Sequence, residues 1–298
     1  YGRKEKDCLL AQECEPRRDL LGDEALLLSG RLGGVPIAVS ADRAGGVLRL
    51  AEEGVDLAIA DDGFQHRKMG RDVDVALIDA TCPFGNGRLM PAGMLRESPR
   101  SLIRAHLVVI TKADQVPPER VEEITDMIKE ISGRSPFLSS LALAGWSRFL
   151  GPREGLRDSG MPGLPVAAFS AIGNPVSFGS FLEKLGFPTI FHEAFRDHHI
   201  FSEEELDVIC RRVISSGARS LVCTEKDIFN LPQEWSPPLP VYVPRVRAVL
   251  GDERSFISAL SHYLQPKVVV SSNGHGEDAI GSLLAERLKK KFPLSDVS

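Results

Sequence analysis

The sequence predicts an α/β protein with a parallel-sheet lobe followed by a second α/β lobe. Compact apolar runs alternate with amphipathic helical patterns along most of the 298 residues, as in parallel sheets that helices cover on both faces. That length also suggests about two domains. The net charge of −5, with no basic stripe, gives no reason to expect nucleic-acid binding. No apolar run reaches the roughly 18 to 20 residues that span a bilayer.

Four strands and two helices are expected in the first lobe. The apolar runs at 34–43, 54–63, 72–80 and 105–114 predict strands, and helical patterns cover 22–32 and 119–131. Ligands of such sheets bind beyond the carboxyl ends of the strands. Five aspartates fall there: Asp42, Asp61, Asp62, Asp79 and Asp114.

The second lobe begins near Ser135. Strands are expected within 164–175, 219–227 and 239–246, and helices over 176–187 and 202–218, the latter with Ser202 and Glu205 at capping-box spacing. The stretch 135–150 contains no convincing helix or strand and is taken as the junction. The domain prediction is therefore a first lobe at 1–135, a second lobe at 136–265, and a separate strand–glycine turn–helix unit at 266–298.

Asp61 and Asp62 stand side by side where a buried strand ends. Two carboxylates at close range repel each other, so a positive partner is expected. A hard cation such as Mg²⁺ is one candidate, because it prefers oxygen ligands and is held this way in P-loop enzymes. Alternatively, one aspartate caps the following turn while the other is solvated.

Two further segments carry candidate functional side chains. The glycine- and proline-rich stretch 85–98 contains Arg88, Arg96 and Glu97, and Arg96 either binds a phosphate or pairs with Glu97 at the surface. "FRDHHIF" places Asp197, His198 and His199 before a helix, which suits either proton transfer or a helix-entry turn. "TKAD" and "TEKD" each follow a strand and are ambiguous.

The five cysteines are odd in number and form no C-x-x-C pair. Neither a disulfide framework nor a zinc site is indicated, and reduced thiols in a reducing compartment are expected.

Taken together, "DDGFQHRKMGRDVDVALIDA", "FGNGRLMPAGMLRES", "RAHLVVITKAD", "FSAIGNPVSF", "FRDHHIFSEEEL" and "VCTEKDIFNL" resemble the tetraacyldisaccharide 4'-kinase family. The resemblance covers about residues 1 to 263 in order and spacing. It implies a P-loop kinase-like first lobe and transfer of the ATP γ-phosphate to the 4'-hydroxyl of a tetraacylated glucosamine disaccharide 1-phosphate, which yields lipid IVA. It also implies ATP and Mg²⁺ as cofactors, and peripheral attachment to the cytoplasmic face of the inner membrane.

The same resemblance implies roles for particular residues. Asp61 and Asp62 would hold Mg²⁺, and Asp62 would support phosphoryl transfer. Asp23 would be the base, with His198 as a partner that raises its basicity. The residues implied to bind substrate or phosphate are Tyr1, Arg43, Gln65, His66, Arg96 and Glu97.

The pattern departs from the family at both ends. No G-x-x-x-x-G-K-[ST] phosphate loop occurs among the 298 residues, so we expect a piece of a longer protein whose isolated form is inactive. "VVVSSNGHGEDAIGSLLAERL" near the C-terminus resembles the start of a lipid-A-disaccharide-synthase-related glycosyltransferase. A catalytically degenerate nucleotide-fold binding protein and a kinase–glycosyltransferase fusion remain as alternatives.

Overall fold

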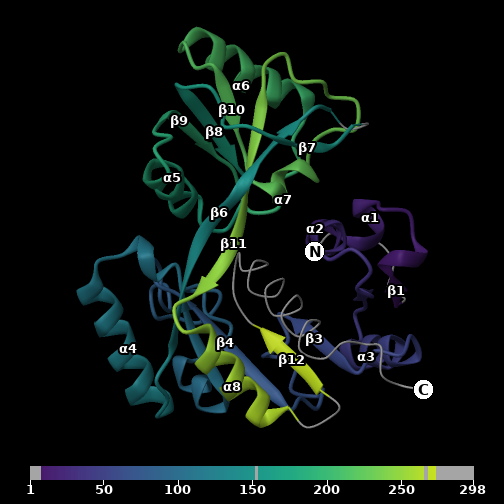
Figure 1. Cartoon of the computed structure of the whole chain (residues 1–298), viewed down its shortest axis with the longest axis vertical. Helices are drawn as coiled ribbons and strands as arrows, with labels where there is room; N and C mark the ends of the chain where they lie inside the picture. Colours follow the sequence, from purple (N-terminus) through teal and green to yellow (C-terminus); the bar gives the residue numbers. More distant parts are fainter. Residues whose placement is uncertain (1–7, 152–153, 265–267, 273–298) are drawn as a thin grey trace. The chain divides into compact units, whose positions relative to one another are not determined.

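The chain forms two compact units, each built on a sheet (Figure 1). The computed structural model describes residues 8–151, 154–264 and 268–272. Unit 1 consists of Pro16–Leu27 and Ala142–Arg247, and unit 2 of Leu28–Leu141 together with residues 8–15 and 248–272. Three elements contribute residues to both units: α2 (Asp23–Arg31), β6 (Phe137–Phe149) and β11 (Val241–Leu250).

Unit 2 holds the predicted first-lobe strands. Its other elements are β1 (Leu9–Leu10), η1 (Ala11–Glu13), β2 (Ala38–Val39), α3 (Arg43–Glu52), β3 (Leu57–Asp61), β4 (Val73–Asp79), η2 (Pro99–Arg104), β5 (Leu107–Thr111), η3 (Ala113–Gln115), α4 (Pro118–Ser132), α8 (Glu253–Tyr263) and β12 (Val268–Ser272). The main sheet has the order β3-β12-β4-β5-β6 and its pairs are parallel. The predicted α/β class with a parallel sheet is thus confirmed.

The two faces of the unit 2 sheet are covered by different helices. Val75 and Val109 face a cluster that includes Phe256 and Leu260 of α8, whereas Ala76 and Ile110 face Ile124 and Ile128 of α4 (Figure 1). Because successive strand residues point to opposite faces, apolar residues must follow one another along β4 and β5. That is the pattern of compact apolar runs seen in the sequence.

Unit 1 repeats this plan with its own elements. They are α1 (Arg18–Leu21), β7 (Leu156–Ser159), β8 (Val166–Ser170), α5 (Pro175–Lys184), β9 (Thr189–Ala194), α6 (Glu203–Ser215), β10 (Ser220–Val222) and α7 (Glu225–Ile228). The strand order is β6-β11-β10-β8-β9, with β7 antiparallel to β6. Strand β8 pairs in parallel with both β10 and β9. The predicted capping box at Ser202 and Glu205 opens α6.

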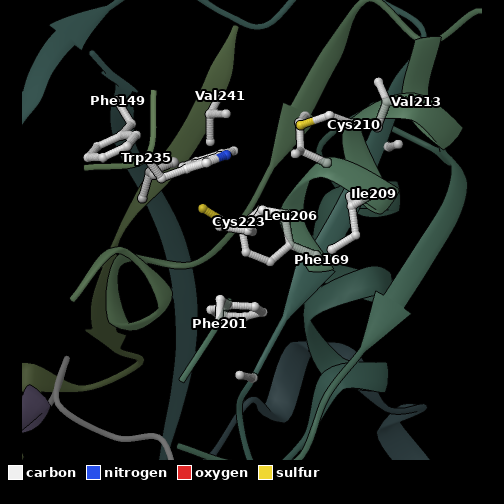
Figure 2. Packing of buried hydrophobic residues seen from close by; sticks show 14 residues of the cluster. Phe149, Phe169, Phe201, Leu206, Ile209, Cys210, Val213, Cys223, Trp235 and Val241 are labelled. Carbon is white, nitrogen blue, oxygen red and sulfur yellow. The ribbon is translucent and has the colours of Figure 1, made fainter. Parts of the chain in front are cut away.

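Aromatic packing dominates one face of the unit 1 sheet. The rings of Phe149 and Trp235 are stacked, with centroids 6.3 Å apart. Figure 2 shows this pair and, in the same cluster, Phe169 above Phe201. The rings of Phe169 and Phe201 meet edge to face at 5.1 Å, a geometry that the ring quadrupoles favour. Helix α6 closes this face, and α5 closes the opposite one through Phe178 and Leu182.

Three sequence predictions differ from the structure. The stretch 135–150 contains a 13-residue strand, β6. Its burial alternates irregularly because its two halves pack in different units, so no single period is visible. The run 34–43 contributes only the two-residue β2, which pairs antiparallel with β1 outside the main sheet. Residues 253–263, which the predicted second lobe of 136–265 includes, form helix α8 and pack in the core of unit 2.

The predicted separate unit at 266–298 is only partly described. Strand β12 lies between β3 and β4 and pairs in parallel with both, so these five residues belong to the unit 2 sheet. The glycine turn and helix predicted after it lie outside the described residues.

Candidate active site

Asp23 and His198 meet within unit 1 although 175 positions separate them. His198 Nδ1 lies 2.8 Å from Asp23 Oδ2, and Asp23 Oδ1 accepts the backbone N–H of Glu24 at 3.1 Å. Asp23 opens helix α2 and is only 2% exposed. Its charge is therefore stabilised by protein groups more than by water. The pair that the resemblance implies is brought together because 16–27 packs with 142–247.

His198 is held in an uncommon backbone conformation. Its φ is +59°, in the left-handed region that costs a non-glycine residue about 1 to 2 kcal/mol. Its backbone N–H donates to the carbonyl of Ala171, at the end of β8, at 3.3 Å. This contact and the Asp23 hydrogen bond fix the direction of the ring.

The neighbouring His199 belongs to a different cluster. Its Nε2 lies 3.1 Å from both carboxylate oxygens of Glu205, the residue that completes the capping box of α6. Its ring also stacks on Phe195 with centroids 4.9 Å apart. Only His198 reaches Asp23, whereas His199 contacts the residue that caps α6.

Lys226 of α7 approaches the same pair, a partner that was not among the predicted site residues. Its Nζ lies 3.5 Å from His198 Nε2, 3.2 Å from Glu24 Oε1 and 3.6 Å from Asp197 Oδ1. Asp197 Oδ2 in turn lies 3.7 Å from His198 Nε2. The available signal was the position of "TEKD" directly after a strand, which places it at the carboxyl edge of the sheet with the end of β8.

The electrostatic effect of His198 on Asp23 is opposite to the one that the resemblance implies. Burial raises the pKa of Asp23, but the hydrogen bond from His198 and the positive charges of Lys226 and Arg18 outweigh it, so the pKa lies below its usual value. A donor to a carboxylate stabilises the charged form. His198 therefore keeps Asp23 ionised and oriented, and does not raise its basicity.

In unit 2, Asp62 has a cationic partner. Arg96 Nη1 lies 2.6 Å from Asp62 Oδ2, while Asp61 Oδ1 accepts the backbone N–H of Asp62 at 3.0 Å. Asp62 has a φ of +54°, so the chain turns sharply between the two carboxylates and their side chains take different partners. Pairing of Arg96 with Glu97, one of the two alternatives that the sequence left open, is not among the ion pairs of the described residues.

The turn after Asp62 is anchored by Arg71. Its guanidinium donates to the carbonyls of His66 at 2.6 Å and Met69 at 3.1 Å, and forms a two-point ion pair with Asp74. The side chains of Arg71 and Asp74 are 8% and 10% exposed. The anchored turn presents His66 at the surface and leaves Gln65 Oε1 buried without a hydrogen-bond partner.

Oxygen groups of the kind that hold a magnesium ion gather at the end of β3 in the sequence. Asp61 is the last residue of β3, and Asp62 and Gln65, whose amide oxygen is buried without a hydrogen-bond partner, follow it. Hard cations take oxygen ligands of this kind. Within the described residues, no three His, Cys, Asp or Glu side chains converge on one point. Mg²⁺ does not require such a cage, because it commonly uses one or two carboxylates with water and phosphate oxygens.

The loop that carries Arg96 is tightly closed. Asn86 donates to the carbonyl of Ala92 and accepts the N–H of Arg88, and a Cβ on Gly93 would lie 2.1 Å from Asn86 Oδ1. Only glycine fits at that position. The segment 85–98 is therefore a packed loop that fixes the position of the Arg96 backbone.

Glu97 and Arg43 have ordinary protein partners. Glu97 pairs with Arg104 at 2.5 Å and Arg67 at 3.1 Å. Burial raises the pKa of Glu97, but the hydrogen bond from Arg104 and the charges of Arg104 and Arg67 lower it below its usual value. Arg43, the first residue of α3, donates to the carbonyl of Ser40 at 3.5 Å. Tyr1 lies outside the described residues.

Two other strand-end carboxylates, those of Asp79 and Asp42, have structural partners. Asp79 pairs with the nearly buried Lys112 of "TKAD" at 2.5 Å and accepts the backbone N–H of Thr81. Asp42 caps α3 by accepting the backbone N–H of Ala44.

No helix in the described part of the chain is both long and apolar enough to cross a bilayer.

Comparisons with known proteins identify the family. The model of a family described as tetraacyldisaccharide-1-P 4'-kinase matches residues 1–265. A tetraacyldisaccharide 4'-kinase from Anaeromyxobacter dehalogenans is 43% identical over 216 residues, which are 70% of this chain and 56% of that relative. One from Pelobacter propionicus is 31% identical over 248 residues, or 82% of this chain and 66% of the relative.

A solved structure agrees with this match. It is the "apo" form of LpxK from Aquifex aeolicus in complex with ATP, with a TM-score of 0.63 and 25% identity, and the alignment covers 89% of this chain and 77% of that one. The chain spans little more than half the length of the first of these relatives. It belongs to the tetraacyldisaccharide-1-P 4'-kinase family.

Proposed function

We propose that the protein containing this chain transfers the γ-phosphoryl group of ATP to the 4'-hydroxyl of a tetraacylated glucosamine disaccharide 1-phosphate, giving lipid IVA. The observation that carries the proposal is the 2.8 Å contact between His198 and Asp23. The family match and the name of the relatives support the reaction. The protein would bind this acceptor while attached peripherally to the cytoplasmic face of the inner membrane.

Asp23 acts as the base in this reaction. As the sugar oxygen forms its bond to the γ-phosphorus, the bond from that phosphorus to the oxygen bridging to the β-phosphate breaks, and the hydroxyl proton passes to Asp23. His198 donates from Nδ1 to the carboxylate and holds it in line for this transfer. A pKa below the usual value keeps Asp23 ionised and ready at neutral pH.

Asp61, Asp62 and Gln65 would hold Mg²⁺, which neutralises charge on the transferring phosphates when bound. Arg96 shields the Asp62 carboxylate through its ion pair. Arg96 and Arg43 supply fixed positive charge for the phosphate groups of the substrates, while Glu97 and His66 offer hydrogen bonds to the disaccharide. Phosphoryl transfer needs such positioning and charge neutralisation more than covalent catalysis.

The test compares Asp23→Asn with Asp158→Asn in the chain extended by its upstream coding sequence, assayed with ATP and the disaccharide acceptor. Asp158 is a 78% exposed aspartate of the same unit. We expect Asp23→Asn to lower kcat at least about 100-fold with little change in KM, and Asp158→Asn to leave kcat unchanged. Near-normal turnover by Asp23→Asn would refute its role as the base.

The metal ligands are tested separately. Asp61→Ala or Asp62→Ala should lower kcat by orders of magnitude while far-UV circular dichroism stays unchanged, and turnover close to normal in both variants would rule out the assignment. Nucleotide binding without phosphate transfer in the extended chain would favour the degenerate binding protein. Glycosyl transfer by a chain extended at its C-terminus would favour the fusion.

A further inference from the structure

We infer that Lys226 is a positioning residue for the Asp23–His198 pair, because its ammonium group holds the His198 ring in the tautomer that carries its proton on Nδ1. The inference rests on the proposed function only for its catalytic consequence. The assignment of the tautomer depends only on contacts within unit 1. Lys226 Nζ lies 3.5 Å from His198 Nε2, on the opposite side of the ring from the 2.8 Å contact with Asp23.

The local sequence explains how Lys226 is placed beside His198. Thr224 and Asp227 form a capping box that opens α7. Asp227 is fully buried and also accepts the backbone N–H of Ala171 at 2.8 Å. The carbonyl of Ala171 accepts the backbone N–H of His198. One short segment thus anchors the His198 backbone through Asp227 and faces the His198 ring through Lys226.

The tautomer follows from donor and acceptor roles. A lysine ammonium can only donate, and a neutral imidazole has one N–H and one lone pair. A Lys226 that faces Nε2 favours the lone pair there, which leaves the proton on Nδ1. Nδ1–H then points at a carboxylate oxygen that can only accept while Asp23 is ionised. All three groups are satisfied at once by this arrangement.

Asp197 disfavours this tautomer, and Lys226 offsets the effect of Asp197. Asp197 Oδ2 lies 3.7 Å from His198 Nε2 and would favour a proton on that nitrogen. Lys226 lies 3.6 Å from the other oxygen of Asp197 and 3.2 Å from Glu24, so it balances both acidic neighbours. Lys226 is only 13% exposed, which limits screening of these charges by water.

Lys226 also acts on the base itself. Burial raises the pKa of Asp23, but the hydrogen bond from His198 and the positive charges of Lys226 and Arg18 hold it below the usual value. Loss of Lys226 removes one of these opposing charges. The pKa of Asp23 then rises, and a larger fraction of the base is protonated at mildly acidic pH.

The first test reads the tautomer and needs no enzymatic activity. The ¹⁵N chemical shifts of His198 are measured by long-range ¹H–¹⁵N correlation in the full 298-residue chain, with the His198 signals assigned from a His198→Gln variant. We expect mainly Nδ1–H in the native chain and in Lys226→Arg, and a shift of population toward Nε2–H in Lys226→Met. Lys184→Met, the same change at an exposed position of α5, should match the native chain. An unchanged tautomer in Lys226→Met overturns the inference.

The second test reads the consequence for catalysis in the upstream-extended chain. In Lys226→Met the acid limb of the kcat/KM profile should move to higher pH, KM should change little, and Lys226→Arg should restore the native profile. An equal loss at every pH would mean a merely structural role and would overturn the inference. Failure of the proposed function is a separate outcome, namely no phosphate transfer by the native extended chain or full transfer by Asp23→Asn, and it leaves the tautomer test intact.

Discussion

Asp227 makes the stability of unit 1 depend on pH in a direction opposite to most aspartates. The carboxylate is fully buried and accepts from Ala171 N–H, Thr224 N–H and Thr224 Oγ1. Burial raises its pKa from 3.8 to about 6, against the lowering effect of these hydrogen bonds. Three donors therefore compensate only part of the cost of removing the charge from water.

The sign and size follow from linkage. Because the pKa is higher in the folded state, the folded chain holds a proton between about pH 4 and pH 6 that the unfolded chain has released. The stabilisation is complete below the unfolded pKa and is lost as the pH rises through the folded pKa. The gap of about two units corresponds to roughly 3 kcal/mol at 1.36 kcal/mol per unit.

Asp227→Asn removes this titration while keeping the size of the side chain. The free energy of unfolding is measured in urea from pH 4 to pH 7.5, with tryptophan fluorescence as the signal. Both tryptophans of the chain, Trp146 and Trp235, lie in unit 1, so the signal reports that unit. The native value minus the Asp227→Asn value should fall by roughly 2.5 kcal/mol across this range, because the unfolded chain is already partly ionised at pH 4. Any constant offset that the substitution introduces leaves this fall unchanged.

The difference between the two chains isolates Asp227, because every other titrating group is shared. Asp158→Asn, at an exposed position, should give a flat difference over the same pH range. A difference for Asp227→Asn that is flat, or that rises with pH, would show that Asp227 is not held with a raised pKa and would refute the reasoning.

Four further outcomes are expected. Arg71→Met should lower the free energy of unfolding by about 3 to 5 kcal/mol, because it leaves the Asp74 carboxylate nearly buried and unpaired. Denaturant unfolding followed by circular dichroism measures this loss, and a loss below about 1 kcal/mol would contradict the prediction. Leu182→Ala, at a site with no exposed surface, should cost about 2 to 5 kcal/mol by tryptophan fluorescence, and a neutral effect contradicts the packing described. Gly93→Ala should disrupt the closed loop and speed proteolysis within 85–98, whereas native protease resistance would argue against the tight approach. The 298-residue chain should bind ATP weakly and transfer no measurable phosphate, while the upstream extension restores both; full activity from the shorter chain would refute this.

Elements whose pattern depends only on their own residues could be predicted. Strands β3, β4, β5, β8 and β10 were expected from their apolar runs, and the Ser202–Glu205 capping box from its spacing. Strand β6 was missed because its halves are buried in two different units and its period is broken at the transition. The run 34–43 was predicted as a strand of the main sheet but contributes only β2 outside it. Apolar composition does not say which sheet, if any, a short extended segment will join.

What the sequence by itself determined was the fold class, the family and the residue types available for chemistry, since these depend on local pattern and ordered motifs. Only the tertiary structure decided which of those residues are partners. Asp23 reaches His198 because 16–27 folds into unit 1, and Arg96 takes Asp62 in place of its neighbour Glu97 because the closed loop and the turn at Asp62 set their directions. Partner choice depends on distances of a few ångströms between segments far apart in the chain, and no local pattern encodes those distances.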